Sequence, residues 1–293
     1  MSGIKNIIGN TPLVLLEQIN PNPKVKLYAK LEGQNPGGSV KDRAAYYMIK
    51  TGLEEGVLNA DSTIIEATSG NTGIALAMIA AGFGIKIILV MPSNATMERV
   101  KTMRAYGAEV VFTPEEKTIE YSRQWAAEEA VKKGYVILDQ FNNINNRRAH
   151  IETTGPEIWR DTNGEITHFV SAMGTTGTIT GTSTFLKSQN QDVKVVGAQP
   201  TEGSRIPGIR KWSEEMLPRI FQKDKVDEII YVSRDMAIDH SRLLAEKEGI
   251  MGGMSSGGAL YCALQLAARI ESGTIVFIVC DRGDRYLSTD LFE

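Results

Sequence analysis

The chain has 293 residues, of which 42% are hydrophobic and 23% are charged, and its formal net charge is −3. These values are typical of a globular protein, and they indicate no basic surface of the kind that binds nucleic acid. A single hydrophobic core becomes unfavourable near this length, so we expect two domains.

The same numbers bear on location and metal binding. Residues 1–14 contain one lysine and no long apolar stretch, which predicts no signal peptide. No segment approaches the roughly 20 apolar residues that cross a bilayer. Cys262 and Cys280 are too few and too far apart for a disulfide framework or a zinc site, and the three histidines have no metal-like spacing. We therefore expect a cytoplasmic protein that binds no metal, membrane or nucleic acid.

Short β-rich runs alternate with helical patterns along the chain, which predicts βαβ units and mainly parallel sheets. A first group of strands is expected at residues 63–67, 85–91, 109–112 and 136–138. The helices among them are expected at residues 72–81, 96–106 and 118–133. A second group of strands is expected at residues 166–172, 193–199, 228–232 and 274–280, joined by an early strand at residues 25–31.

This pattern predicts an α/β fold with two open, mainly parallel sheets. The smaller domain is expected to span residues 40–141, and the larger domain residues 1–39 plus 142–293. The active site would lie in the cleft between them. The order of the strands does not follow from the sequence.

A glycine-rich turn, Thr68-Ser69-Gly70-Asn71-Thr72-Gly73, follows the strand at residues 63–67 and opens a helix. Such a junction directs free backbone N–H groups and the positive end of the helix dipole at one point. The hydroxyls of Thr68, Ser69 and Thr72 add donors, so a small carboxylate is a natural ligand. An ordinary capped helix start would give a similar pattern.

A second turn, Gly174 to Thr178, repeats this arrangement with three threonines and no lysine or arginine. It matches neither the dinucleotide fingerprint nor the P-loop, and its neutral donors suit a monophosphate better than a triphosphate. A tight packing turn is the alternative. A third glycine cluster, residues 252–258, precedes an apolar helix at 259–268 and is weak evidence by itself.

Lys41 lies in the run Asn35-Pro36-Gly37-Gly38-Ser39-Val40-Lys41-Asp42-Arg43, between a flexible loop and an apolar helix. Together with the two turns, this pattern closely resembles the fold-type II pyridoxal-phosphate enzymes, and within them the cysteine synthases, or O-acetylserine sulfhydrylases. The resemblance extends from Ile8-Gly9-Asn10-Thr11-Pro12-Leu13 to Asp281-Arg282-Gly283-Asp284-Arg285-Tyr286.

The resemblance implies a role for each matching position. Lys41 would hold pyridoxal 5′-phosphate as a Schiff base, Asn71 would bond the phenolic oxygen of the ring, and Ser255 would face the pyridine nitrogen. The phosphate cup would consist of Gly174, Thr175, Thr176, Gly177 and Thr178. The substrate carboxylate would be held by Thr68, Ser69, Asn71 and Thr72, with help from Gln140.

The reaction implied is a β-replacement. O-acetyl-L-serine would lose acetate to give an α-aminoacrylate, sulfide would add to form L-cysteine, and Lys41 would transfer the Cα proton. Closure of the smaller domain would exclude water. The resemblance also implies a homodimer. Two alternatives stay open: another enzyme of the class, such as a cystathionine β-synthase or serine dehydratase, and a non-catalytic relative that senses carboxylates.

Within the family the chain is most similar to the B-type, which also uses thiosulfate to make S-sulfocysteine. Gly208-Ile209-Arg210-Lys211-Trp212 and Cys280 support this similarity, and Arg210 could hold a charged sulfur donor. Residues 142–146 are rich in asparagine where the family usually has prolines, which leaves the stiffness of the substrate pocket open. The mixed-sign loop at residues 281–285 is expected to be a salt-linked turn and not part of the catalytic machinery.

Overall fold

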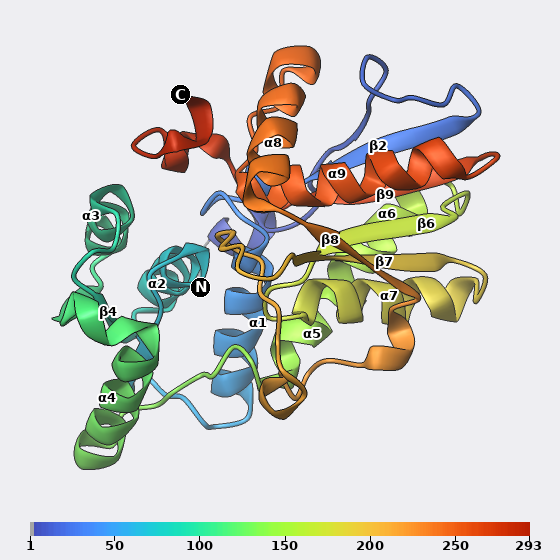
Figure 1. Ribbon diagram of the computed structural model, residues 1–293. Coiled ribbons are helices and arrows are strands. Elements are labelled where there is room, and N and C mark those ends of the chain that lie inside the picture. Colours follow the sequence, from blue (N-terminus) through green and yellow to red (C-terminus); the bar gives the residue numbers. More distant parts are fainter. Residues whose placement is uncertain (1–2) are drawn as a thin grey trace.

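The computed structural model describes residues 3–293 and contains two α/β domains, each built on its own sheet (Figure 1). The larger sheet has the strand order β1-β2-β9-β6-β7-β8, and every neighbouring pair is parallel except β1 and β2. Its strands are β1 (Leu13–Leu15), β2 (Val25–Leu31), β6 (His168–Ala172), β7 (Lys194–Pro200), β8 (Glu228–Val232) and β9 (Gly273–Val279). The predicted pairing of the early strand with this sheet is confirmed, because β2 lies parallel to β9.

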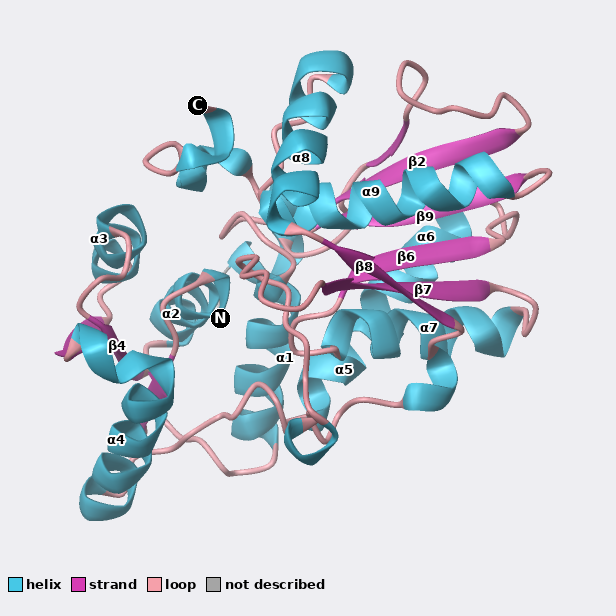
Figure 2. Cartoon of the chain, viewed as in Figure 1, coloured by secondary structure: helices cyan, strands magenta, loops and turns pink. Residues whose placement is uncertain are grey.

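Helices cover both faces of the larger sheet (Figure 2). The apolar side chains of α8 (Arg234–Glu248) and α9 (Met254–Arg269) pack on one face, and those of α6 (Gly155–Asp161) and α7 (Gly177–Gln189) pack on the other. Burial on both faces explains why the central strands β6, β7 and β9 are buried almost throughout, whereas the edge strand β8 alternates between buried and exposed side chains.

The smaller sheet has the order β3-β4-β5 and is fully parallel. Its strands are β3 (Thr63–Ala67), β4 (Lys86–Pro92) and β5 (Glu109–Thr113). On one face lie α1 (Lys41–Glu54), α2 (Asn71–Phe83) and α3 (Met97–Ala105), and on the other lies α4 (Thr118–Lys133). The strand predicted at residues 136–138 is reduced to a single bridge between Ile64 and Val136.

Short helical segments connect these elements. They are η1 (Gly3–Ile7), η2 (Glu32–Gln34), η3 (Glu115–Lys117), α5 (Ile144–Ala149), the π-helical η4 (His150–Thr154), η5 (Glu214–Met216), η6 (Lys223–Lys225), η7 (Gly283–Tyr286) and η8 (Asp290–Phe292). None of the helices within residues 3–293 combines the length and the apolar character that crossing a membrane requires.

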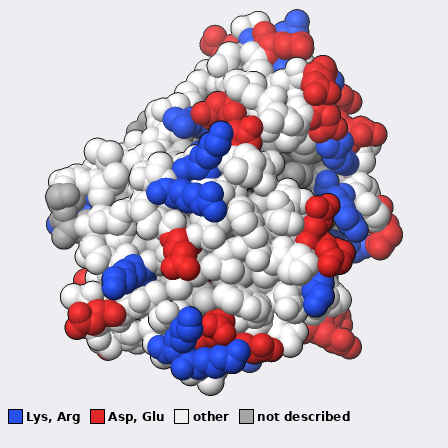
Figure 3. Space-filling view, turned by 90° about the vertical axis from the view of Figure 1, so that its left-hand side faces the viewer, with Lys and Arg blue, Asp and Glu red and all other residues white. Residues whose placement is uncertain are grey.

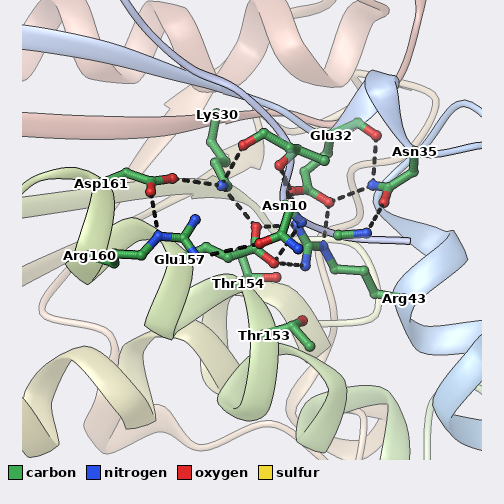
Figure 4. A network of polar contacts seen from close by, with 12 residues as sticks. Asn10, Lys30, Glu32, Asn35, Arg43, Thr153, Thr154, Glu157, Arg160 and Asp161 are labelled. Carbon is green, nitrogen blue, oxygen red and sulfur yellow. Dashed lines mark hydrogen bonds and ion pairs between the residues drawn. The ribbon is translucent and has the colours of Figure 1, made fainter. Parts of the chain in front are cut away.

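A buried ionic network joins α1 to the larger domain (Figure 4). The Arg43 guanidinium is fully buried and pairs with Glu32 at 2.7 Å and with Glu157 at 2.6 Å. Lys30 also pairs with Glu157, at 2.9 Å. Burial raises the pKa of Glu157, but Arg43 outweighs that effect and lowers it to about 2. These charges fix the first turn of α1, and therefore Lys41, relative to the larger sheet.

The surface carries both signs of charge. Figure 3 shows small groups of Lys and Arg side by side with Asp and Glu on the face that the smaller domain presents, with broad uncharged areas between them. Mixed charge of this kind is what the formal net charge of −3 leads one to expect.

Candidate active site

The carboxyl ends of the central strands meet where the two domains face each other. The loop before α1 is fastened there, because the Val40 N–H donates to the Cys280 carbonyl at 2.8 Å and Ser39 bridges to Asp281. The turn after β3 leads into α2, and the turn after β6 leads into α7. In parallel α/β sheets, ligands bind at this edge.

Lys41 is the first residue of α1 and is partly buried. Burial lowers the pKa of its amine, while the charge of the neighbouring Asp281 opposes that shift. A lowered pKa increases the fraction of neutral amine, which is the form that attacks a carbonyl carbon or accepts a proton. The geometry thus suits Lys41 for covalent attachment and for proton transfer.

The turn before α2 forms one side of the site. Thr68 and Thr72 are buried, and the Thr72 hydroxyl donates to the Gln140 side-chain oxygen at 2.7 Å. This bond connects the turn to Gln140, which is also buried. Ser69 is partly exposed at the same turn. The structure therefore brings the predicted carboxylate-binding residues together with Gln140, and the N-terminus of α2 adds its dipole.

The Gly174–Thr178 turn begins α7 and has the features of a phosphate cup. Thr176 has a φ of 69°, which is rare for threonine, and its buried hydroxyl has no hydrogen-bond partner within residues 3–293. A Cβ at Gly174 would lie 2.6 Å from the Gly208 carbonyl oxygen, so only glycine fits there. An unpartnered hydroxyl at the N-terminus of a helix fits a bound phosphate group.

Two residues that were not predicted support this cup. The Asn146 amide donates to Thr175 Oγ1 at 3.1 Å, and His150 Nε2 lies 3.2 Å from Thr178 Oγ1. Burial lowers the pKa of His150 to about 3, so its ring is neutral at physiological pH. Neither contact could be found from the sequence, because both connect the cup with a segment 28 or 29 residues earlier.

Ser255 is buried in the first turn of α9. It lies near Gly208, where an added Cβ would come within 3.1 Å of its hydroxyl. Cys280, at the end of β9, is adjacent, and burial raises the pKa of its thiol to about 11. The thiol is therefore protonated at neutral pH, so Cys280 contributes no charge here.

Asn71, the first residue of α2, forms hydrogen bonds with residues of the larger domain. Its side-chain N–H donates to Asp281 at 2.6 Å, and Arg285 donates to its side-chain oxygen. The loop at residues 281–285 is therefore in direct contact with a predicted site residue. The sequence predicted a salt-linked turn here but did not predict this contact.

Arg210 lies beside Phe141 and Trp212, with its guanidinium carbon 5.6 Å and 5.5 Å from the two ring centroids. Arg123, from α4 of the smaller domain, lies 4.4 Å from the same Phe141 ring. Burial and the nearby charge of Arg123 both lower the pKa of Arg210. The guanidinium groups of Arg123 and Arg210, which come from different domains, thus both lie against the Phe141 ring.

The asparagine-rich segment at residues 142–146 is held by its own side chains. Asn142 donates to the Asp139 carboxylate at 2.6 Å, Asn143 donates to the Leu138 carbonyl at 2.9 Å, and Asn146 donates to the Gln140 carbonyl at 2.7 Å. Hydrogen bonds therefore restrain this segment where proline rings are usual in the family.

Comparison with known proteins defines the class. Residues 4–281 match the family model described as "Pyridoxal-phosphate dependent enzyme". Among curated relatives, cysteine synthase B of Escherichia coli (strain K12) is 52% identical over 292 residues, which cover 100% of this chain and 96% of that protein. Cysteine synthase B of Pseudomonas aeruginosa is 50% identical, with 99% and 97% covered.

Solved structures agree. A crystal structure of O-ureido-L-serine synthase superposes with a TM-score of 0.94 at 36% identity and covers 100% of this chain and 95% of its own. A cysteine synthase from Entamoeba histolytica gives 0.94 at 37% identity, covering 100% and 90%. The chain is a fold-type II pyridoxal-phosphate dependent enzyme. Within that class, it belongs to the cysteine synthase family, closest in type to the B form. The roles of the individual site residues stay predictions.

Proposed function

We propose that this enzyme forms L-cysteine from O-acetyl-L-serine and sulfide by β-replacement. The observation that carries the proposal is the convergence of Lys41, the turn at residues 68–72 and the cup at residues 174–178, which hydrogen bonds connect through Gln140, Asn146 and Asp281. The identity of 50–52% to three cysteine synthases B over nearly the whole chain supports it.

Each predicted residue then has a physical task. Lys41 holds the cofactor and transfers the proton at the α-carbon of the substrate. The hydroxyls of Thr68, Ser69 and Thr72 bind the substrate carboxylate, assisted by Gln140. The phosphate is held by the cup, which consists of Gly174, Thr175, Thr176, Gly177 and Thr178. Pyridoxal phosphate held by these residues would supply an electron-withdrawing ring, which would favour loss of acetate from the β-carbon.

Ser255 and Asn71 orient the cofactor in this proposal. A serine hydroxyl at the pyridine nitrogen does not keep that nitrogen protonated as an aspartate would, so electron withdrawal stays moderate. Loss of the β-substituent is then favoured over racemisation and transamination.

Domain closure and assembly complete the proposal. The smaller domain, residues 40–141, closes when the substrate carboxylate binds its turn, which excludes water from the site. We further propose that the enzyme is a cytoplasmic homodimer, which calibrated light scattering of the purified protein would measure.

Steady-state turnover tests the reaction. Purified enzyme supplied with O-acetyl-L-serine and sulfide should release L-cysteine and acetate in equal amounts, detected by mass spectrometry. Release of pyruvate at the expense of cysteine would indicate a dehydratase. Absence of turnover with retained carboxylate binding would indicate the non-catalytic alternative.

We also propose that thiosulfate is accepted and that Arg210 binds it, which would yield S-sulfocysteine. The pair of guanidiniums beside Phe141 would stabilise a divalent anion better than a single cation would. Arg210→Ala should therefore reduce kcat/KM for thiosulfate at least about tenfold more than for sulfide.

The matched control for Arg210 is Lys211→Ala. Lys211 is exposed and paired with Glu202 at 2.6 Å, so its removal should leave the ratio of the two activities unchanged. Equal losses with both sulfur donors in Arg210→Ala would exclude Arg210 from the donor site.

A further inference from the structure

The Asn71 side chain forms hydrogen bonds with two charged residues of the turn that follows β9. Its Nδ2 donates to Asp281 Oδ2 at 2.6 Å, and Arg285 Nη1 donates to its Oδ1. Arg285 Nη2 also donates to the Gly37 carbonyl at 3.0 Å. The turn therefore connects the first residue of α2 with the loop that precedes Lys41.

The charges on the two partners determine which way the Asn71 amide points. A carboxylate only accepts hydrogen bonds and a guanidinium only donates them. A flipped amide would place its oxygen against Asp281 and its NH2 group against Arg285, and both hydrogen bonds would be lost. Since each involves a charged partner, the flip carries a large penalty.

The fixed orientation leaves one donor of the amide available. The NH2 group has two N–H bonds, and Asp281 accepts from one of them. The second N–H is therefore oriented as well, on the same side of the amide. A deprotonated phenolic oxygen at this position would accept a hydrogen bond from that N–H.

The turn is itself firmly held. Asp281 is fully buried and its Oδ2 also accepts from the Tyr286 hydroxyl at 2.7 Å. Gly38 has a φ of +82°, and a Cβ at that position would collide with the Arg285 guanidinium. From the smaller domain, the Arg99 guanidinium lies 5.1 Å above the Tyr286 ring. The position of Arg285 thus depends on several elements at once.

We propose that Asp281 and Arg285 are positioning residues that orient the Asn71 amide so that its free N–H faces the ring oxygen of the cofactor. The inference rests on the proposed role of Asn71 in binding that oxygen. In this role Asp281 and Arg285 act on the cofactor through Asn71, while the Asp281 charge also acts on the Lys41 amine.

A double-mutant cycle on the full-length protein loaded with pyridoxal phosphate tests this. The measurements are the visible absorption spectrum of the bound cofactor and its dissociation constant, for the wild type, Arg285→Ala, Asn71→Ala and the double variant. Arg285→Ala should shift the spectrum and weaken cofactor binding about tenfold. The double variant should match Asn71→Ala, because without the amide there is nothing left to orient.

Two further variants keep the test independent of folding. Asp281→Asn preserves size but accepts and donates, so it should shift the spectrum even if Arg285→Ala does not fold. Because the Asp281 charge also acts on the Lys41 amine, this shift supports the inference only if it is absent when Asp281→Asn is combined with Asn71→Ala. Arg282→Ala is the matched control, because Arg282 is exposed on the same turn and its side chain pairs with Asp284 at 3.3 Å, away from Asn71. Its spectrum and dissociation constant should equal those of the wild type.

The outcomes separate this inference from the proposed function. If Asn71→Ala shifts the spectrum while Arg285→Ala and Asp281→Asn do not, the positioning role is wrong and the cofactor role of Asn71 stands. If Arg285→Ala has the same effect with and without the Asn71 amide, the turn only supports the fold and the inference is wrong. If Asn71→Ala itself changes neither quantity, the proposed cofactor role of Asn71 fails, and this inference fails with it.

Discussion

Lys30 on β2 and Lys41 at the start of α1 are two lysines in different environments. Lys30 is fully buried, and its amine is committed to Glu157 at 2.9 Å and to the Thr11 carbonyl at 2.7 Å. Lys41 has a lowered pKa because burial is only partly offset by nearby groups. A buried lysine whose amine is taken up by a carboxylate and a carbonyl is structural, whereas an amine with a lowered pKa is suited to chemistry.

The ionic network around Arg43 predicts a large effect on stability. Arg43→Ala leaves the buried carboxylates of Glu32 and Glu157 without their main partner, so the free energy of unfolding should fall by about 3–5 kcal/mol. Urea unfolding measures this. The control is Lys26→Ala, which breaks an exposed pair with Glu165 at 2.8 Å and should have a much smaller effect. Similar changes in the two variants would contradict the importance given to the network.

The buried Glu66 on β3 should make the stability of the fold depend on pH. It is buried, it accepts from the Leu138 and Asp139 N–H groups at 3.1 Å, and burial raises its pKa to about 7. Between its unfolded pKa and pH 7, the folded chain binds more protons than the unfolded one, so stability falls as pH rises.

Glu66→Gln should remove that fall. The variant should match the wild type in urea unfolding at pH 5 and exceed it by about 1–3 kcal/mol at pH 8. Glu116→Gln, at an exposed site, is the control and should change neither value. An equal difference from the wild type at both pH values would show that ionisation of Glu66 is not the cause.

Among the elements, α7 begins with a conformation that weakens the fold. Thr176 has a positive φ, which costs about 1 kcal/mol or more for a threonine. Thr176→Gly should therefore stabilise the cofactor-free protein by about 1 kcal/mol and weaken binding of pyridoxal phosphate severalfold, because a donor is lost. Thermal unfolding and a cofactor titration measure the two effects.

Asn163→Gly is the matched control for this prediction, because Asn163 also has a positive φ, of 50°, but lies in an exposed turn. Its cofactor affinity should be unchanged. An unchanged affinity in Thr176→Gly would instead place the phosphate elsewhere.

The elements differ in how well the sequence predicts them. The strands β3, β4, β6, β7 and β9 are apolar runs bounded by turn residues, so their positions follow from pattern alone. β1 has only three residues, Leu13–Leu15, and was not predicted. The segment at 136–138 is apolar like a strand, but it makes only one bridge to β3.

At the scale of the whole molecule, contacts between segments far apart in the chain could not be predicted from the sequence. The strand order and the contacts of Asn71 with Asp281 and Arg285, 210 and 214 residues away, depend on how the two domains meet. The glycine turns were predictable because a strand, a turn and a helix start are adjacent in the chain. The boundary of the smaller domain at residues 40 and 141 stays a prediction.

The central claim is that Lys41 carries the cofactor, and reductive trapping tests it directly. Borohydride treatment of the pyridoxal-phosphate-loaded protein, followed by digestion and peptide mass mapping, should place the cofactor label on Lys41 alone. Lys41→Ala should carry no label. Lys50→Ala removes a partly exposed lysine of the same helix and should label as the wild type does. Label on Lys30 or any other lysine in the wild-type protein would contradict the account.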